Sequence, residues 1–185
     1  MKKIIKPTFQ LVSHLSNQHY DQVILGGIKG AEKSVLIATA NVKNLMVRRL
    51  KRYFSIIETF ARLCQKGVDI KILFARKPSQ PFLDAMHKHP ELEQEHFDMR
   101  LCARNHMKLV SIDNRTMYLG SANFTGAGLG LRARERHNFE MGMVTHDTAM
   151  IKEASDIFYD IWSGRMCKKC AFRKNSCKLP LDQIE

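Results

Sequence analysis

The chain has 185 residues, enough for one domain with a sizeable core, and 44% of them are hydrophobic. Its formal charge of +12 and isoelectric point near 9.7 favour an anionic partner, either nucleic acid or an anionic membrane surface. No stretch approaches the roughly 20 apolar residues of a membrane-spanning helix. The apolar part of the basic N-terminus is too broken for a cleaved signal peptide, so we expect a cytoplasmic protein.

Hydrophobic periodicity predicts strands that alternate with helices along the chain. In the first half we expect a helix over 21–32, a buried strand over 34–42, a helical region over 43–66, a second buried strand over 68–75 and a short helix around 82–88. In the second half we expect strands over 97–113, 116–122 and 138–146, a glycine-rich basic loop over 126–138 and a helix over 147–162. This order predicts an α/β fold with a mixed β-sheet flanked by helices on both faces. We expect one domain over 1–163 and a basic, cysteine-rich tail over 164–185 that packs on it.

The most informative segment runs from His106 to Asn123 and reads HMKLVSIDNRTMYLGSAN. His106 and Lys108 are two residues apart, so they would share one face of a strand, where side chains alternate with a period of two. An imidazole can act as a nucleophile or a proton carrier near neutral pH, and a neighbouring cation binds phosphate. Ser121 and Asn123 follow the second apolar run and add small hydrogen-bond donors for the same anion.

This segment resembles the HKD signature of the phospholipase D superfamily, H-x-K-x4-D-x6-G-[ST]-x-N. Both spacings are intact, and the matching residues are His106, Lys108, Asp113, Gly120, Ser121 and Asn123. The resemblance extends from about residue 20 to about residue 162. It implies phosphodiester chemistry without a catalytic metal, in which one histidine forms a covalent phosphohistidine and a second protonates the leaving group.

The chain holds one copy of the signature, whereas the resemblance implies two copies in each active site. The other His/Lys cluster, at 87–89, has the wrong spacing and no downstream motif. We therefore expect a homodimer formed through the HKD face, with an active site that straddles a two-fold axis. Each subunit would contribute His106 and two phosphate-binding groups, Lys108 and Asn123.

The resemblance also assigns roles to four further residues. Ser121 would be a lesser donor to the phosphate. Glu140 matches the acidic residue that, in the nuclease branch, orients the histidine by accepting its second N–H, and Asn138 precedes it at the expected spacing. Asp113 belongs to the catalytic motif, and we expect it to support the motif's geometry rather than to react.

Five cysteines in a chain without a secretory signal are expected to be reduced thiols or metal ligands rather than a disulfide framework. Cys167 and Cys170 have the C-x2-C spacing of metal ligands, and Cys177 follows closely. The pattern resembles the cysteine staple of certain DNA-end-processing nucleases, which hold a [4Fe–4S] cluster, and it also fits zinc. For the fourth ligand we favour Cys102, which alternates out of phase with its apolar neighbours, over Cys64, which lies on an apolar helical stripe. Either metal would be structural.

Nucleic acids and phospholipids are both phosphodiesters, so the signature does not distinguish them. Basic clusters spread along the chain suit a polyanionic backbone, and no clear interfacial helix suggests a lipid surface. The candidate substrate contacts are Asn138 and the loop residues Arg132, Arg134 and Arg136. The sequence thus predicts a metal-independent phosphodiesterase that cleaves DNA or RNA. The alternatives are a phospholipase D or phosphatidyl transferase, and a non-catalytic nucleic-acid-binding module on the same scaffold.

Overall fold

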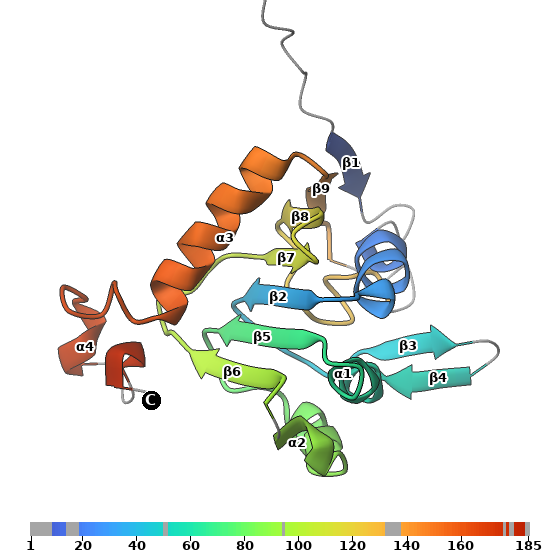
Figure 1. Cartoon of the computed structure of the whole chain (residues 1–185), viewed down its shortest axis with the longest axis horizontal. Coiled ribbons are helices and arrows are strands. Elements are labelled where there is room, and N and C mark those ends of the chain that lie inside the picture. Colours follow the sequence, from blue (N-terminus) through green and yellow to red (C-terminus); the bar gives the residue numbers. More distant parts are fainter. Residues whose placement is uncertain are drawn as a thin grey trace, which may run out of the picture.

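The computed structural model describes residues 9–13, 19–49, 52–93, 95–131, 138–175, 177 and 180–183. Within these residues, seven strands form a mixed sheet in the order β1-β9-β8-β7-β2-β5-β6 (Figure 1). The parallel strands are β2 (Ser34–Thr39), β5 (Asp69–Phe74) and β6 (Phe97–Leu101). The antiparallel part consists of β7 (Leu109–Ile112), β8 (Thr116–Gly120), β9 (Met141–Thr145) and β1 (Phe9–Ser13).

Helices cover both faces of this sheet, which confirms the expected fold class. On one face, α3 (Thr148–Trp162) packs Ile151, Phe158 and Trp162 against an apolar cluster that includes Leu36 and Leu73. The other face carries η2 (Tyr20–Gly27), η3 (Ile28–Gly30), α1 (Ile56–Cys64) and α2 (Gln80–Met86), which bury apolar side chains in a larger cluster. Because both faces of β2 are covered, this strand is apolar from Val35 to Ala38 rather than alternating, whereas β5 alternates at Asp69–Ile72 before its apolar end.

The region 43–66 differs from the expected continuous helix. β3 (Met46–Arg49) and β4 (Arg52–Ser55) form an antiparallel hairpin, and only α1 is helical. Ser55 ends the hairpin and caps the helix: its Oγ accepts a hydrogen bond from the Ile57 N–H at 3.1 Å, and Glu58 accepts one from the Ser55 N–H at 3.4 Å. This capping box defines where the helix begins, so the helical prediction for 43–55 was wrong.

The predicted strand over 97–113 is interrupted, and the interruption positions the motif. β6 ends at Leu101 on the edge of the sheet, and β7 begins at Leu109 beside β2. The connection over 102–108 therefore passes the carboxyl ends of β5 and β2. His106 and Lys108 lie in this connection, immediately before β7, and not within a strand as expected.

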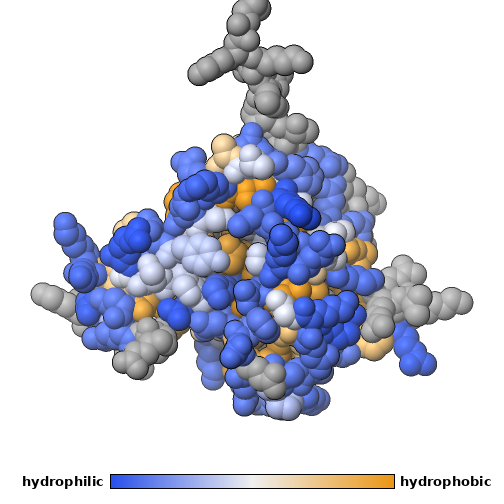
Figure 2. All heavy atoms as spheres, in the orientation of Figure 1, coloured by the Kyte–Doolittle hydropathy of each residue, from blue (hydrophilic) through white to orange (hydrophobic). Residues whose placement is uncertain are grey.

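The remaining elements follow the predicted order. Two residues with positive φ, Asp113 (55°) and Asn114 (52°), make the tight turn between β7 and β8. The short elements are η4 (Pro90–Glu93), α4 (Phe172–Asn175) and η6 (Leu181–Gln183). Among the described residues, none of the helices has the length and apolar character needed to cross a membrane. The face in Figure 2 is mostly hydrophilic, with scattered hydrophobic residues.

Candidate active site

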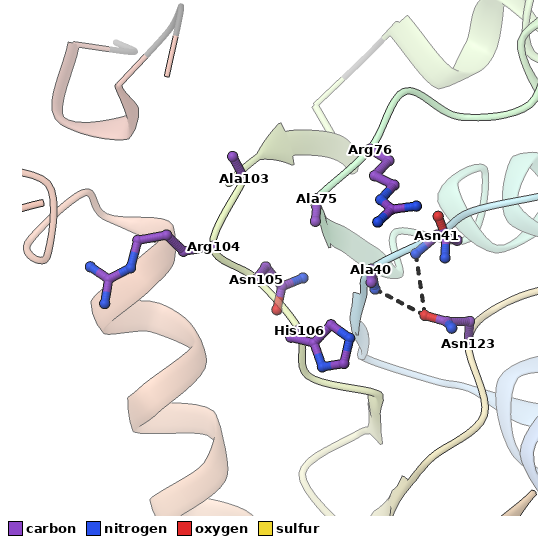
Figure 3. Close-up of a pocket in the computed structure, with 9 residues that line it drawn as sticks. All are labelled: Ala40, Asn41, Ala75, Arg76, Ala103, Arg104, Asn105, His106 and Asn123. Carbon is purple, nitrogen blue, oxygen red and sulfur yellow. Dashed lines mark hydrogen bonds between the residues drawn. The ribbon is translucent and has the colours of Figure 1, made fainter. Parts of the chain in front are cut away.

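A hollow of about 190 Å³ lies where the parallel strands β2, β5 and β6 end. Segments that follow all three strands line it, together with Asn123 from the loop after β8. In Figure 3 the side chains of Arg76, His106 and Asn123 point into this hollow, whereas that of Arg104 extends away from it. Carboxyl ends of parallel strands are the usual position of a ligand site in α/β proteins.

His106 and Lys108 are in direct contact at the rim of this hollow. The Lys108 Nζ lies 3.1 Å from each ring nitrogen of His106 and donates a hydrogen bond to the His106 carbonyl oxygen at 2.8 Å. Lys108 is 9% exposed, whereas His106 is open to solvent. Burial lowers the pKa of Lys108, and the attraction of Glu140 opposes this decrease. The pair combines an accessible imidazole with a sheltered cation.

Asn105 holds the segment that carries the histidine. Its Nδ2 donates to the carbonyl oxygens of Thr39 at 3.1 Å and Leu73 at 2.9 Å, and its Oδ1 accepts from the Met107 N–H at 3.2 Å. The side chain is 4% exposed and so ties together the ends of β2 and β5 and the connection before β7. The sequence analysis missed Asn105 because an asparagine beside a catalytic histidine has no distinctive spacing.

Asn123 is oriented by its amide oxygen. The Oδ1 accepts hydrogen bonds from the Ala40 N–H at 3.2 Å and the Asn41 N–H at 3.3 Å (Figure 3). It also accepts one from the Thr39 hydroxyl at 3.3 Å. These contacts use the acceptor side of the amide. The Nδ2 group is therefore the part that can donate to an anion in the hollow.

Glu140 is paired within its own chain to residues other than the histidine. Ser121 Oγ donates to Glu140 Oε2, and Asn138 Nδ2 donates to Oε1 at 3.0 Å. The carboxylate is 9% exposed and attracts Lys108. Among the described residues, the side chains that donate to Glu140 are Ser121 and Asn138, and the side chain in contact with the His106 ring is Lys108. The orientation of His106 by Glu140 stays a prediction. Ser121 and Asn138 here position the carboxylate.

Asp113 lies at the opposite end of β7 from the hollow. Its carboxylate accepts hydrogen bonds from the backbone N–H groups of Glu32 at 3.0 Å, Lys33 at 2.7 Å and Ser34 at 2.9 Å, where β2 begins. Burial raises the pKa of Asp113, but these donors and the charge of Arg115 outweigh it, so the pKa lies below its usual value. Asp113 joins β7 to β2 and does not line the hollow.

Comparison with known families assigns the chain to one family. The family described as "Cardiolipin synthase, PLD-like domain" matches residues 24–162, which is most of the chain and includes the whole motif. The chain belongs to the PLD-like domain family. The tail after residue 162 lies outside the matched region. A search of curated proteins found no match.

Solved structures with the same fold include two bacterial proteins. NucT from Helicobacter pylori is 20% identical over 88% of this chain and 97% of its own, with a TM-score of 0.59. Nuc from Salmonella typhimurium, described as a phospholipase D family member, is 21% identical over 85% of this chain and 95% of its own, also with a TM-score of 0.59. TrmBL2, an archaeal chromatin protein whose structure shows a mode of DNA binding, is 12% identical over 88% of this chain and 54% of its own, with a TM-score of 0.57. At these identities the likeness establishes the PLD-like fold alone.

Close packing around Gly120 explains why the motif has a glycine at this position. A Cβ atom on Gly120 would lie 2.4 Å from the Tyr118 hydroxyl oxygen and 2.7 Å from the Gly142 Cα. The Tyr118 side chain is 2% exposed, and burial raises its pKa to about 12. Its hydroxyl oxygen accepts from the Ala122 N–H at 3.3 Å. Gly120 thus lets β8 and β9 approach closely over the tyrosine, just before the Ser121 and Asn123 positions.

The basic residues considered as substrate contacts fall into two sets. Arg132, Arg134 and Arg136 lie outside the described residues. Arg76, which the sequence analysis did not single out, lines the hollow immediately after β5. The signal for Arg76 was its place at the carboxyl end of a buried strand that is parallel to β2.

The tail of the PLD-like chain packs beside the motif connection. Cys102 and Cys167 pack against the α3 cluster, and burial raises the pKa of Cys102, with further increases from Cys167 and Cys170. Arg104 bonds to Cys170 and lowers the pKa of that thiol. Cys64 is buried elsewhere and its pKa is raised to about 11. Among the described residues, which include all five cysteines, no three His, Cys, Asp or Glu side chains are grouped to hold a metal ion.

Proposed function

We propose that this protein is a phosphodiesterase that cleaves nucleic acid without a catalytic metal, through a covalent phosphohistidine on His106. The observation that carries the proposal is that His106 and the Asn123 amide line one hollow at the carboxyl ends of the parallel strands, with Lys108 in contact with His106. These groups supply what a phosphodiester needs: a nucleophile, a cation and a fixed donor to the non-bridging oxygens.

The proposed reaction has two steps. In the first, a ring nitrogen of His106 attacks phosphorus, a P–N bond forms, and the bond to the leaving oxygen breaks as that oxygen takes a proton from a second histidine. In the second, water attacks phosphorus, gives its proton to the second histidine, and breaks the P–N bond. Lys108 and Asn123 bind the non-bridging oxygens in both steps.

The second histidine is His106 of the partner subunit in our proposal, because this chain has one copy of the motif. Exposed apolar side chains next to Glu140 are the observation that motivates a partner: Phe139 is 91% exposed and Met141 is 61% exposed. Exposed apolar residues beside a polar site are typical of an interface. A two-fold axis through the HKD face would bring the two hollows together with one self-complementary contact.

Nucleic acid is the substrate class that the charge of the molecule favours. A formal charge of +12 suits a polyanion, whose binding releases many counterions. The family description names cardiolipin synthase, which makes a phospholipase or phosphatidyl transferase the second candidate. The third candidate is a non-catalytic DNA-binding module, for which the fold likeness to the chromatin protein TrmBL2 is the motivating observation.

The decisive experiment compares the wild-type protein with His106→Ala on single- and double-stranded DNA and RNA in EDTA. We expect cleavage by the wild type and a loss of about 10³-fold or more in the variant, since removal of a covalent nucleophile abolishes the main pathway. His87→Ala is the matched control, because His87 is an exposed histidine in a neighbouring His/Lys cluster. A covalent adduct between the protein and one fragment of the cleaved strand, trapped with the wild type and absent in His106→Ala, would identify the intermediate.

Each alternative gives a different result. Release of phosphatidate or a free headgroup from vesicles, with no cleavage of any nucleic acid, would replace the proposal with the lipid enzyme. Salt-sensitive binding of nucleic acid without turnover, unchanged by His106→Ala, would indicate the non-catalytic module.

A further inference from the structure

The β3–β4 hairpin is separate from the main sheet and is anchored where it joins the domain. β3 and β4 pair with each other in a two-stranded sheet, and they extend away from the sheet centre in Figure 1. At the base, Leu45 and Val47 are 1% and 2% exposed, and the Ile56 N–H donates to the Leu45 carbonyl oxygen at 2.7 Å. Ser55 Oγ donates to Asn44 Oδ1 at 2.7 Å. A lone hairpin is marginally stable, so this anchoring holds it in place.

A groove of about 220 Å³ lies between the hairpin and the glycine-rich loop after Asn123. Met46 and Tyr53 from the hairpin, Lys43 before it, and Gly126 and Leu131 from the loop line the groove. Tyr53 is 62% exposed and Met46 is 46% exposed. The groove is smaller than the roughly 300–1,000 Å³ pockets that enclose drug-sized ligands, so it suits one flat ring on the tyrosine.

This groove continues from the catalytic hollow along two adjacent segments, 40–44 and 123–126. Val42 and Phe124 form a parallel bridge, and the Lys43 N–H donates to the Phe124 carbonyl oxygen at 3.1 Å. The first residues of both segments line the hollow, and the later ones line the groove. A chain bound at His106 could therefore pass directly into the groove.

The charge of the hairpin is complementary to a phosphate backbone. From Lys43 to Ser55 the sequence has five basic residues, Lys43 included, and no acidic residue. Lys43 and Arg52 are exposed, and Arg52 directly precedes Tyr53. At this edge of the molecule, hydrophobic and hydrophilic residues lie next to each other in Figure 2. An aromatic ring among basic residues is the arrangement by which proteins bind single strands.

We propose that this groove binds one base of a single-stranded nucleic acid, stacked on Tyr53, while Lys43 contacts the phosphate that links this nucleotide to the one at His106. The inference rests on the proposed function and assigns its substrate as single-stranded. A base within a duplex is already stacked on its neighbours, so it would have to be unstacked to reach the tyrosine. Stacking is tolerant of sequence because every base presents a flat face.

The test measures binding in a His106→Ala background, so that the strand is not consumed. The probes are a single-stranded DNA oligonucleotide and an abasic strand of equal length, which keeps the phosphates and lacks the bases. With Tyr53 present we expect about tenfold tighter binding of the strand that has bases. Tyr53→Ala should remove this preference, and Tyr53→Phe should retain it. Tyr159→Ala is the matched control, because Tyr159 is 43% exposed on α3.

A fluorescence measurement and a kinetic ratio extend the test. Trp162, the single tryptophan, is 6% exposed, so Tyr53→Trp adds an exposed reporter that base stacking should quench. With His106 intact, we expect Tyr53→Ala to lower kcat/KM for the oligonucleotide about tenfold relative to that for bis(p-nitrophenyl) phosphate, a diester without a neighbouring nucleotide to place in the groove.

The outcomes separate this inference from the proposed function. Absence of turnover on every substrate would sink the phosphodiesterase, yet the binding preference would still decide the role of Tyr53. An unchanged preference for bases in Tyr53→Ala would overturn the inference. So would a Tyr53→Ala variant that loses binding to phosphatidylglycerol vesicles while retaining the preference for bases, since the hairpin would then be a membrane contact.

Discussion

The oxygen and the nitrogen of the Asn123 carboxamide have different roles. Its oxygen accepts the Ala40 and Asn41 N–H groups, and its nitrogen is left for the substrate. We predict that Asn123→Asp, which keeps an acceptor and replaces the donor by a negative charge, lowers kcat by about 10²–10³-fold. Thermal unfolding should change little compared with Asn123→Ala, which loses both ends. A variant Asn123→Asp with near-normal turnover would show that the amide does not contact phosphate.

Asp113 is the motif residue for which we predict an effect on stability and not on catalysis. Asp113→Ala removes the carboxylate that accepts hydrogen bonds from three backbone N–H groups, and it places alanine at a φ of 55°. We expect it to lower the free energy of unfolding by about 2 kcal/mol and Tm by about 4–8 °C. Asp113→Asn keeps an acceptor and tolerates this φ, so it should cost less. Kinetic constants measured well below Tm should stay close to those of the wild type. A large drop in kcat at unchanged Tm would contradict this assignment.

The pH dependence of this contribution follows from the lowered pKa of Asp113. The unfolded chain binds a proton at a higher pH than the folded chain does. The stabilisation is therefore fully present above the ordinary aspartate pKa and is lost as the pH falls through the lower folded pKa. Denaturant unfolding of the wild type and Asp113→Asn should converge at acidic pH.

Single residues were predictable where a motif spacing specified them, and less so where their role depends on a neighbour in space. His106, Lys108 and Asn123 could be selected from the sequence because six positions match one pattern. Asn105 and Arg76 could not, because their importance comes from the ends of β2 and β5, which are distant in sequence. The pairing of Ser121 with Glu140 likewise depends on β8 lying beside β9.

At the level of elements, the buried strands were predicted well and the segments around them less well. β2 is a short apolar run and β5 combines alternating and apolar residues, and both are short enough to favour strands over helices. The hairpin was predicted as helix because its basic residues and scattered apolar residues fit a helical period, and its two strands gain little from pairing alone. The break between β6 and β7 depends on a sheet order that local periodicity does not contain.

For the C-terminal segment we predict a structural metal site that holds either zinc or a [4Fe–4S] cluster. Cys167 and Cys170 have the spacing of metal ligands, and Cys102 and Cys167 pack against the same apolar cluster. The described side chains do not themselves form a group of three ligands, so the prediction rests on the spacing. We predict that protein purified without oxygen holds metal, that Cys170→Ser loses it with a lower Tm, and that Cys64→Ser retains it. Elemental analysis and the visible spectrum distinguish a coloured cluster from zinc. Metal-free protein whose Tm is indifferent to added zinc or iron would refute the prediction.

For the whole molecule, the arrangement of the site within one chain is itself an argument for a dimer. The hollow is open, one histidine lines it, and Glu140 is paired with Ser121 and Asn138. Two roles, nucleophile and acid, require two histidines, and a two-fold axis provides both from one gene product. In the proposed dimer, the net charge of +12 on each chain would favour a polyanion that extends from one subunit to the other.

This arrangement predicts that an inactive subunit silences its partner. In a mixed dimer of wild type and His106→Ala, one role lacks its histidine, so activity should follow the square of the wild-type fraction. After subunit exchange in an equal mixture, about one quarter of the dimers should be active, against about one half of the sites if each chain acted alone. Nuclease activity against mole fraction, with sedimentation to confirm the dimer, measures this. An equal mixture with His87→Ala should keep full activity, because that exposed histidine lies outside the hollow. A straight line for the His106→Ala mixtures would mean that each chain completes its own site, and the second proton carrier would then have to come from the same subunit.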